Sequence, residues 1–396
     1  TLSSSSAASD VYKRQVSMFS PHFFNWTEQL KESGHEIYWL DVFDSNTYNK
    51  KIDFVEQIIG WRNRWDYPGR HKIKRHSPGV YKVLNFFNQR NIVSVFEKKI
   101  KEIKPDLVQS FVMYSACVPL LEVMKRNPEI SWLYSAWGND LFYYQNIKKY
   151  RDDMVKVFPY LNYMFADCNR DITIARKLGF RGEVLGVYPG GGGYKFLDYH
   201  SFILPREERN IILIKGYQSK FGRCIPILKA LMEIIADIKH FQIIVFGATK
   251  NVLDFVNNNK EIKQLQNLNV LGKIEHNKVL KLMGQSYIYV GNSISDGMPN
   301  TLLEAIVMEV FPIQSDPGGA TSEIITHNKN GLLIKNPEDS NEIAKWLLLA
   351  IKDKSFVQQA VNFNSKEIKP SLKRDVVRMQ VLEKYNLIEK NIINNK

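Results

Sequence analysis

The sequence predicts an α/β protein built from two doubly wound parallel sheets. Short apolar runs alternate with stretches of helical spacing along the 396 residues. Most of these runs lack the alternation of a strand exposed on one face, so they suit strands that helices cover on both faces. They are too numerous for one six-stranded sheet, and a chain of this length corresponds to two or three domains at ~150 residues each.

The expected strands are short runs, and the first of them is only the end of a strand. They are residues 16–20, 35–42, 106–111, 130–135, 183–187, 210–214, 242–246, 287–290, 311–315 and 331–334. Residues 225–237 between them show the helical spacing, with apolar side chains every three or four positions. A further helix is expected over residues 371–388, with a frayed end after it.

Composition and the positions of Gly and Pro divide the chain into four expected segments. Residues 1–15 are rich in Ser and Ala and resemble translated sequencing-adapter read-through, so we expect an artefactual leader. Residues 16–195 form the predicted amino-terminal domain, residues 196–365 the carboxyl-terminal domain, and residues 366–396 a helix that crosses back to the first domain. The glycine run within residues 188–194 indicates an interdomain hinge or a ligand loop, with a plain surface linker as the alternative.

Composition excludes several classes of protein. With 44% hydrophobic and 24% charged residues, the chain is neither a disordered tail, a coiled coil nor a collagen. No apolar run approaches the ~20 residues of a membrane-spanning helix. The three cysteines are far apart in sequence, which excludes a disulfide framework and favours a reducing cytosol. The net charge of +13 indicates an anionic partner.

The most informative segment is residues 287–334, which reads as strand, polar loop, helix, strand and Gly-Gly turn. Asn300 is the expected N-cap of the first helix, and Thr321 is expected to open a second one. Asp296 and Glu304 carry carboxylates that can accept hydrogen bonds from sugar hydroxyls. The Gly-Gly turn at a helix start can present backbone N–H groups to a phosphate. Both loops follow neighbouring parallel strands, so this edge predicts a nucleotide-sugar site.

The run SDGMPNTLLEA, followed by SDPGGATSEII and NGLL, resembles the donor-site signature of retaining GT-B glycosyltransferases of the family 4 type. The resemblance implies two Rossmann-like domains that face a central cleft. It also implies that Glu304 holds the nucleotide ribose and that Asp296, which replaces the usual Glu, helps to hold the donor sugar. The other donor-binding positions that it implies are Gly297, Met298, Pro299, Asn300, Gly318, Gly319 and Glu323.

The resemblance also assigns cations to the diphosphate leaving group, where most charge develops in the transition state. Lys215 and Arg223 stand where the family carries these cations, and Lys220 is a spare candidate. Lys273 lies where the family passes the nucleotide base along the backbone.

The amino-terminal half resembles the family less closely. Trp137 replaces the usual active-site histidine, whereas Gly138 and Asp140 remain. Asp140 is the candidate for donor-sugar contact or base assistance, with a helix cap as the alternative, and His22 is a second candidate in an expected loop. No Asp-x-Asp pair occurs, so we expect no metal and no cofactor, with the nucleotide-diphosphate sugar as a substrate.

Basic charge is concentrated in residues 61–76, where six Lys and Arg stand against one Asp beside three aromatic residues. This pattern suits an anionic membrane surface, single-stranded nucleic acid or a solvated loop. Family analogy favours a lipid-linked glycan acceptor, so we expect no nucleic-acid partner. The resulting expectation is a cytoplasmic protein with peripheral contact at the inner face of the cytoplasmic membrane.

The leading hypothesis is a retaining, metal-independent glycosyltransferase of cell-surface polysaccharide or lipopolysaccharide assembly, acting on a glycan or lipid-linked glycan. One alternative is a nucleotide-sugar epimerase on the same architecture. A glycoside hydrolase that uses Asp296 and Glu304 as its acid and base is a second. A nucleic-acid-binding protein is the third.

Overall fold

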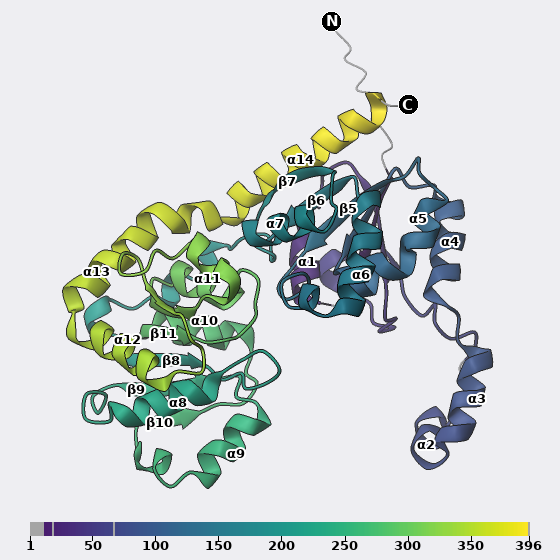
Figure 1. The fold of residues 1–396 in the computed structure, drawn as a ribbon. Helices are drawn as coiled ribbons and strands as arrows, with labels where there is room; N and C mark the ends of the chain where they lie inside the picture. Colours follow the sequence, from purple (N-terminus) through teal and green to yellow (C-terminus); the bar gives the residue numbers. More distant parts are fainter. Residues whose placement is uncertain (1–11, 18–19, 66–67, 395–396) are drawn as a thin grey trace, which may run out of the picture. The chain divides into compact units, whose positions relative to one another are not determined.

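The computed structural model describes residues 12–17, 20–65 and 68–394 (Figure 1). These residues form two compact units. Unit 1 contains the residues up to Ala166, Ala175–Gly186 and the chain from Val381 onward, and unit 2 contains Asp167–Ile174 and Val187–Gln380. The contact boundary therefore lies a few residues before the expected one at residue 195.

Unit 1 is built on a seven-stranded sheet with the order β3-β2-β1-β4-β5-β6-β7. Pairing is parallel from β3 through to β6. β4 is buried along its whole length, as a strand covered on both faces should be. The strands are β1 (Tyr12–Ser17), β2 (Glu36–Asp41), β3 (Glu56–Ile58), β4 (Leu107–Phe111), β5 (Ser131–Ala136), β6 (Tyr163–Ala166) and β7 (Glu183–Val187).

The start of unit 1 differs from the sequence expectation. β1 begins at Tyr12, so residues 12–15 belong to the strand although their composition assigned them to a leader. The rest of that expected leader, residues 1–11, lies outside the described residues. β3 and β6 were not predicted, because runs of three and four residues carry little pattern.

The helices of unit 1 connect these strands. They are α1 (Pro21–Glu28), α2 (Arg70–His76), α3 (Pro78–Asn88), α4 (Ile92–Ile103), α5 (Leu121–Lys125) and α6 (Lys148–Val157). α7 (Asn169–Lys177) and α14 (Arg374–Asn394) are divided between the two units. His22, expected in a loop, lies in the first turn of α1 because Pro21 starts the helix directly after Ser20.

The last part of α14 is a core element of unit 1. The hydroxyl of Tyr385 donates to Gln109 Oε1 at 2.7 Å and accepts from Trp26 Nε1 at 3.1 Å. All three side chains are buried. The helix continues to Asn394, so the expected fraying after residue 388 is wrong within the described residues.

Unit 2 is built on a six-stranded parallel sheet with the order β10-β9-β8-β11-β12-β13. Its strands are β8 (Ile211–Lys215), β9 (Gln242–Phe246), β10 (Leu268–Val270), β11 (Ser286–Gly291), β12 (Phe311–Ser315) and β13 (Leu332–Ile334). Only β10 was not predicted. Apolar clusters lie on both faces of the sheet, one around Ile212 and Ile288 and the other around Leu213 and Tyr289.

The helices of unit 2 cover these faces. They are α8 (Cys224–Glu233), α9 (Lys250–Asn258), α10 (His276–Gly284), α11 (Asn300–Val307), α12 (Ser340–Lys352) and α13 (Lys354–Phe363). Two local expectations are wrong. Asn300 is the first residue of α11 and Pro299 is its N-cap, because Pro fixes the extended backbone there. Thr321 opens only one 3₁₀ turn, Thr321–Glu323.

The glycine-rich segment is tied down within unit 2. The Arg374 guanidinium donates to the carbonyls of Gly191 and Gly192 at 2.9 and 3.0 Å. Gly193 has a φ of 83°, and a Cβ there would lie 2.9 Å from the Leu372 carbonyl oxygen. The need for a glycine at position 193 therefore follows from close backbone packing rather than from a flexible hinge.

No helix in the described part of the chain is both long and apolar enough to cross a bilayer.

Candidate functional site

The loops of unit 2 that carry the predicted site residues follow β8 and β11, the two strands between which the strand order of the sheet reverses. β8 and β11 are neighbours in the sheet, and the crossovers run outward from them in opposite directions. Open parallel sheets bind ligands in the crevice at the carboxyl ends of such strands. Lys215 ends β8, and residues 292–299 follow β11.

Lys215 and Asp296 are brought together at this edge. Lys215 Nζ lies 3.9 Å from Asp296 Oδ2, and both side chains are largely buried. The other carboxylate oxygen of Asp296 accepts the Gly297 N–H at 3.0 Å. Lys215 Nζ also lies 5.0 Å from the ring centroid of Tyr217. The site therefore holds one cation and one carboxylate side by side, where each can meet a polar ligand.

Glu304 lies on α11 and pairs with a residue that the sequence reasoning missed. Its Oε1 is 2.7 Å from Nε2 of His276, the first residue of α10. The Glu304 side chain is only 9% exposed, whereas that of His276 is 60% exposed. The only sequence signal for His276 was its place shortly after Lys273. The pair thus links a buried carboxylate to an accessible imidazole.

Two tyrosines flank the start of α11, Tyr289 fully buried and Tyr194 partly buried. Tyr194 donates to the Asn300 carbonyl at 3.2 Å, and Tyr289 donates to Thr301 Oγ1 at 2.7 Å. Burial raises the pKa of both phenols, and the nearby Glu304 carboxylate raises it further. Both side chains therefore stay neutral and act as hydrogen-bond donors that fix α11 in place.

The Gly-Gly turn after β12 has left-handed backbone at both glycines, with φ of 68° at Gly318 and 85° at Gly319. The Asp316 carboxylate accepts the N–H groups of Thr321 and Ser322 at 2.9 and 3.1 Å. Those two amides are thus already satisfied by the protein. Any ligand oxygen at this turn would meet the backbone around Gly318 and Gly319 instead.

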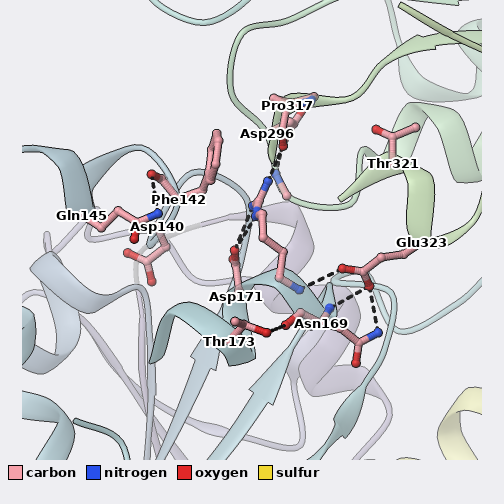
Figure 2. A network of polar contacts seen from close by, with 12 residues as sticks. Asp140, Phe142, Gln145, Asn169, Asp171, Thr173, Asp296, Pro317, Thr321 and Glu323 are labelled. Carbon is pink, nitrogen blue, oxygen red and sulfur yellow. Dashed lines mark hydrogen bonds and ion pairs between the residues drawn. The ribbon is translucent and has the colours of Figure 1, made fainter. Parts of the chain in front are cut away.

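Glu323 caps the start of α7, the part of that helix that belongs to unit 2. Its carboxylate accepts from the backbone N–H of Asn169 at 2.7 Å, from Asn169 Nδ2 at 2.9 Å and from the N–H of Arg170 at 2.8 Å (Figure 2). These amides open α7, where a carboxylate is favourable. These contacts hold the Glu323 carboxylate at the start of α7, and its predicted donor-binding role stays a prediction.

Arg170 extends this network to the Gly-Gly turn. Its guanidinium donates to the Pro317 carbonyl at 2.7 Å and pairs with Asp171 Oδ1 at 2.8 Å. Asp167, Cys168 and Asp171 lie close enough together to suggest a metal site. Because Asp171 is already neutralised by Arg170, this cluster is better explained as an internal ion pair.

The other predicted cations are not gathered at Asp296. Arg223 pairs with Glu338 and also donates to the carbonyls of Ser219 and Gly222. Lys220 Nζ lies 5.2 Å from the Phe221 ring, and Lys273 is exposed after β10. Lys215 is therefore the candidate cation that lies beside a carboxylate of the predicted donor motif.

In unit 1, Asp140 anchors the end of β4. Its buried carboxylate accepts the Met113 N–H at 2.8 Å and the Tyr134 hydroxyl. Val112, which directly precedes Met113, has a φ of 72°, and this backbone conformation is strained for a β-branched residue. These contacts anchor the backbone after β4, and the predicted role of Asp140 in donor-sugar contact or base assistance stays a prediction.

A pocket of about 560 Å³ lies at the carboxyl edge of the unit 1 sheet. It is lined by residues that include Arg62, Arg90, Tyr114 and Ser115. The hydroxyls of Tyr114 and Ser115 are buried there without a hydrogen-bond partner among the described residues. Burial raises the pKa of Tyr114, so its phenol stays protonated. The pocket lining therefore combines two guanidinium groups, which suit an anionic ligand, with two buried hydroxyls.

The carboxyl-terminal region is similar to a known family of proteins. Residues 199–367 match the family described as glycosyl transferases group 1. A curated relative from Campylobacter jejuni is 27% identical over 175 residues, which cover 43% of this chain and 46% of the relative. Its name is GalNAc-alpha-(1->4)-GalNAc-alpha-(1->3)-diNAcBac-PP-undecaprenol alpha-1,4-N-acetyl-D-galactosaminyltransferase. The match thus spans about half the length of that protein.

Solved structures support the fold of the whole chain. Sucrose-phosphate synthase from Thermosynechococcus elongatus superposes with a TM-score of 0.70 at 13% identity, covering 96% of this chain and 100% of that one. HepE from Anabaena in complex with UDP-glucose gives 0.67 at 13% identity, covering 94% and 99%. The lipopolysaccharide outer core galactosyltransferase WaaB gives 0.66 at 13% identity, covering 95% and 99%. The predicted α/β fold of GT-B type is confirmed.

Proposed function

We propose that this chain belongs to the family described as glycosyl transferases group 1, which residues 199–367 match, and that it transfers a sugar from a nucleotide diphosphate to a glycan or lipid-linked glycan. The observation that carries this proposal is the meeting of Lys215 with Asp296 at the reversal point of the unit 2 sheet. Glu304 lies on the helix that follows the Asp296 loop.

Each of these groups has a distinct role in the proposal. The Glu304 carboxylate accepts hydrogen bonds from the ribose hydroxyls, while His276 holds it in one orientation. Asp296 and the backbone from Gly297 to Asn300 bind the hydroxyls of the donor sugar. Lys215 lies beside the diphosphate and stabilises the negative charge that grows on it as the glycosidic bond breaks.

The same proposal includes a reaction that retains the anomeric configuration of the sugar and needs no metal ion. The sugar keeps its anomeric configuration, and the donor phosphate takes the proton of the acceptor hydroxyl. The engagement of Asp140 by Met113 and Tyr134 supports a proton acceptor outside that side chain. The protein then acts mainly by positioning its substrates and by stabilising charge.

The acceptor is proposed to be a lipid-linked glycan of polysaccharide or lipopolysaccharide assembly. The Campylobacter relative is named for a glycan carried on a diphosphate-linked undecaprenol. The cations Arg62 and Arg90 in the unit 1 pocket suit an anionic acceptor of this kind. The basic segment of residues 61–76 suits contact with an anionic membrane surface. We therefore propose that the protein acts at the inner face of the cytoplasmic membrane.

A thermal-shift panel tests the donor site. UDP, GDP, ADP and CMP are each added to the wild-type protein and to two variants, Glu304→Ala and Glu233→Ala. Glu233 is an exposed residue of α8, so its variant serves as the control. A ligand at ~100 times its dissociation constant stabilises by ~2.7 kcal/mol. We expect one nucleotide to raise the melting temperature of the wild type and of Glu233→Ala but not of Glu304→Ala. An equal shift in all three proteins would contradict the donor site.

Product analysis tests the reaction. The donor that binds is incubated with and without a lipid-linked glycan acceptor. We expect a glycosylated acceptor whose new linkage keeps the anomeric configuration of the donor. A changed nucleotide sugar in the absence of acceptor would instead identify an epimerase.

A further inference from the structure

A helical hairpin of unit 1 exposes an apolar face. α3 carries four large apolar side chains with high exposed fractions, namely Val80 at 56%, Val83 at 58%, Phe86 at 81% and Phe87 at 61%. They stand at positions i, i+3, i+6 and i+7, so they share one face of the helix. Single exposed apolar residues are ordinary, but a contiguous stripe of this kind marks an interaction surface.

The hairpin is attached to the rest of unit 1 at its base. Buried Asn88 accepts the N–H groups of Arg64 and Trp65 and donates to the Trp65 carbonyl at 2.9 Å. The backbone of Arg90 donates to the Arg62 carbonyl at 2.7 Å. Beyond this base, α2 and α3 pack on one another (Figure 1). The base thus presents the α3 stripe at a fixed place on the unit.

Positive charge accompanies the stripe. Residues 68–88 contain five Lys and Arg and no acidic residue. Four of these cations, Arg70, Lys72, Lys74 and Arg75, lie on α2. Residues 61–90 as a whole carry eight Lys and Arg against one Asp, which is a large share of the net charge of +13. A cationic helix beside an exposed apolar helix complements an anionic lipid surface in both charge and polarity.

We propose that the α2–α3 hairpin is a membrane anchor that lies in the interface of an anionic bilayer. The α3 stripe enters the acyl boundary, and the cations of α2 meet the lipid phosphates. Trp61 takes no part, because its ring is buried and its Nε1 donates to the Asp41 carbonyl at 2.7 Å. This inference deepens the proposed function, on which it rests for the reason that the protein should meet a membrane.

Vesicle co-sedimentation tests the anchor. Phosphatidylcholine vesicles with and without phosphatidylglycerol are mixed with wild-type protein, with Phe86→Ser/Phe87→Ser, and with Lys72→Glu/Lys74→Glu/Arg75→Glu. Leu197→Ser, which removes another highly exposed apolar side chain, is the matched control. We expect the Phe variant to bind anionic vesicles at least ~10-fold more weakly, because burial of each ring contributes well over the equivalent of one such factor. The charge variant should lose binding mainly at low salt.

Site-specific labelling measures insertion directly. All three native cysteines are buried, so a cysteine introduced at an exposed position can be labelled selectively. An environment-sensitive dye on Phe86→Cys should shift to the blue with anionic vesicles, whereas the same dye on Leu197→Cys should not. Equal responses at the two positions would overturn the anchor, as would unchanged vesicle binding by the Phe variant.

The outcomes separate the anchor from the proposed activity. Nucleotide binding by thermal shift should be the same in the Phe variant and in the wild type. If no nucleotide binds while α3 still governs vesicle binding, the anchor stands and the transferase proposal fails. If sedimentation velocity shows that the Phe variant converts a dimer into a monomer while vesicle binding persists, the stripe is a contact between copies and the anchor proposal is wrong.

Discussion

The Nε2 atom of His276 lies 2.7 Å from Oε1 of Glu304, so an accessible imidazole holds a buried carboxylate at the edge of the unit 2 sheet. The two residues are 28 positions apart and come from different helices, α10 and α11. The contact fixes the direction in which the carboxylate of the proposed ribose site can accept hydrogen bonds.

Glu304→Ala should lower kcat/KM by ~100-fold or more, because ligand hydroxyls buried in the site would lose their acceptor. Steady-state kinetics with the nucleotide sugar found by thermal shift provides the measurement. Glu233→Ala serves as the control and should retain wild-type kinetics. Turnover near that of the wild type in Glu304→Ala would remove the donor assignment.

His276→Ala should raise KM for the donor by ~10-fold while kcat changes little, because the imidazole orients Glu304 and lies outside the reacting atoms. His276→Gln keeps a side-chain donor and should recover part of the loss. An equal fall of kcat in both variants would show that His276 acts on the reacting groups instead.

Lys215→Met should lower kcat by ~100-fold or more, because the proposed function assigns its charge to the diphosphate that forms as the leaving group. Lys220→Met is the matched variant from the following loop, and it should retain most activity. The comparison is made in single-turnover experiments, which separate chemistry from product release. Similar losses in the two variants would argue against a specific role for Lys215.

Asp140→Ala should destabilise the protein by ~1–3 kcal/mol, because it leaves a buried Met113 N–H and the Tyr134 hydroxyl without their acceptor. Urea unfolding followed by circular dichroism measures this change. If stability is unaltered while activity is abolished, Asp140 is catalytic and the structural explanation is wrong.

Stability should fall on acidification because of His327. Its Nδ1 accepts the Leu333 N–H at 3.0 Å. Burial, then the charge of Lys335, lowers the pKa of the folded-state imidazole below its usual 6.5. The unfolded chain therefore binds the proton more readily, so stability is complete above about pH 6.5 and declines as pH falls below it.

Thermal melts across this pH range check the prediction. His327→Gln should flatten the decline relative to wild type, whereas His200→Gln, which removes an exposed imidazole of unit 2, should leave the slope unchanged. An identical slope in wild type and His327→Gln would assign the acid sensitivity to other groups.

Much of unit 2 could be read from local pattern. The runs over residues 242–246 and 311–315 agree with β9 and β12 to the residue, because buried parallel strands are short, continuous and apolar. The elements of unit 1 were harder to predict from the sequence. β3 and β6 are too short for a pattern, and the apolar face of α3 lacks the burial that usually explains such a stripe.

Local sequence pattern is enough to predict the alternation of strands and helices, the motif around Asp296 and Glu304, and the concentration of positive charge near residue 70. Which side chains meet depends on the three-dimensional fold. It paired Lys215 with Asp296 and His276 with Glu304, and it engaged Arg223 with Glu338 and Glu323 with the start of α7. The reason is physical: periodicity reports the local exposure of each residue, whereas partners distant in sequence are set by strand order and by the packing of helices on the sheet.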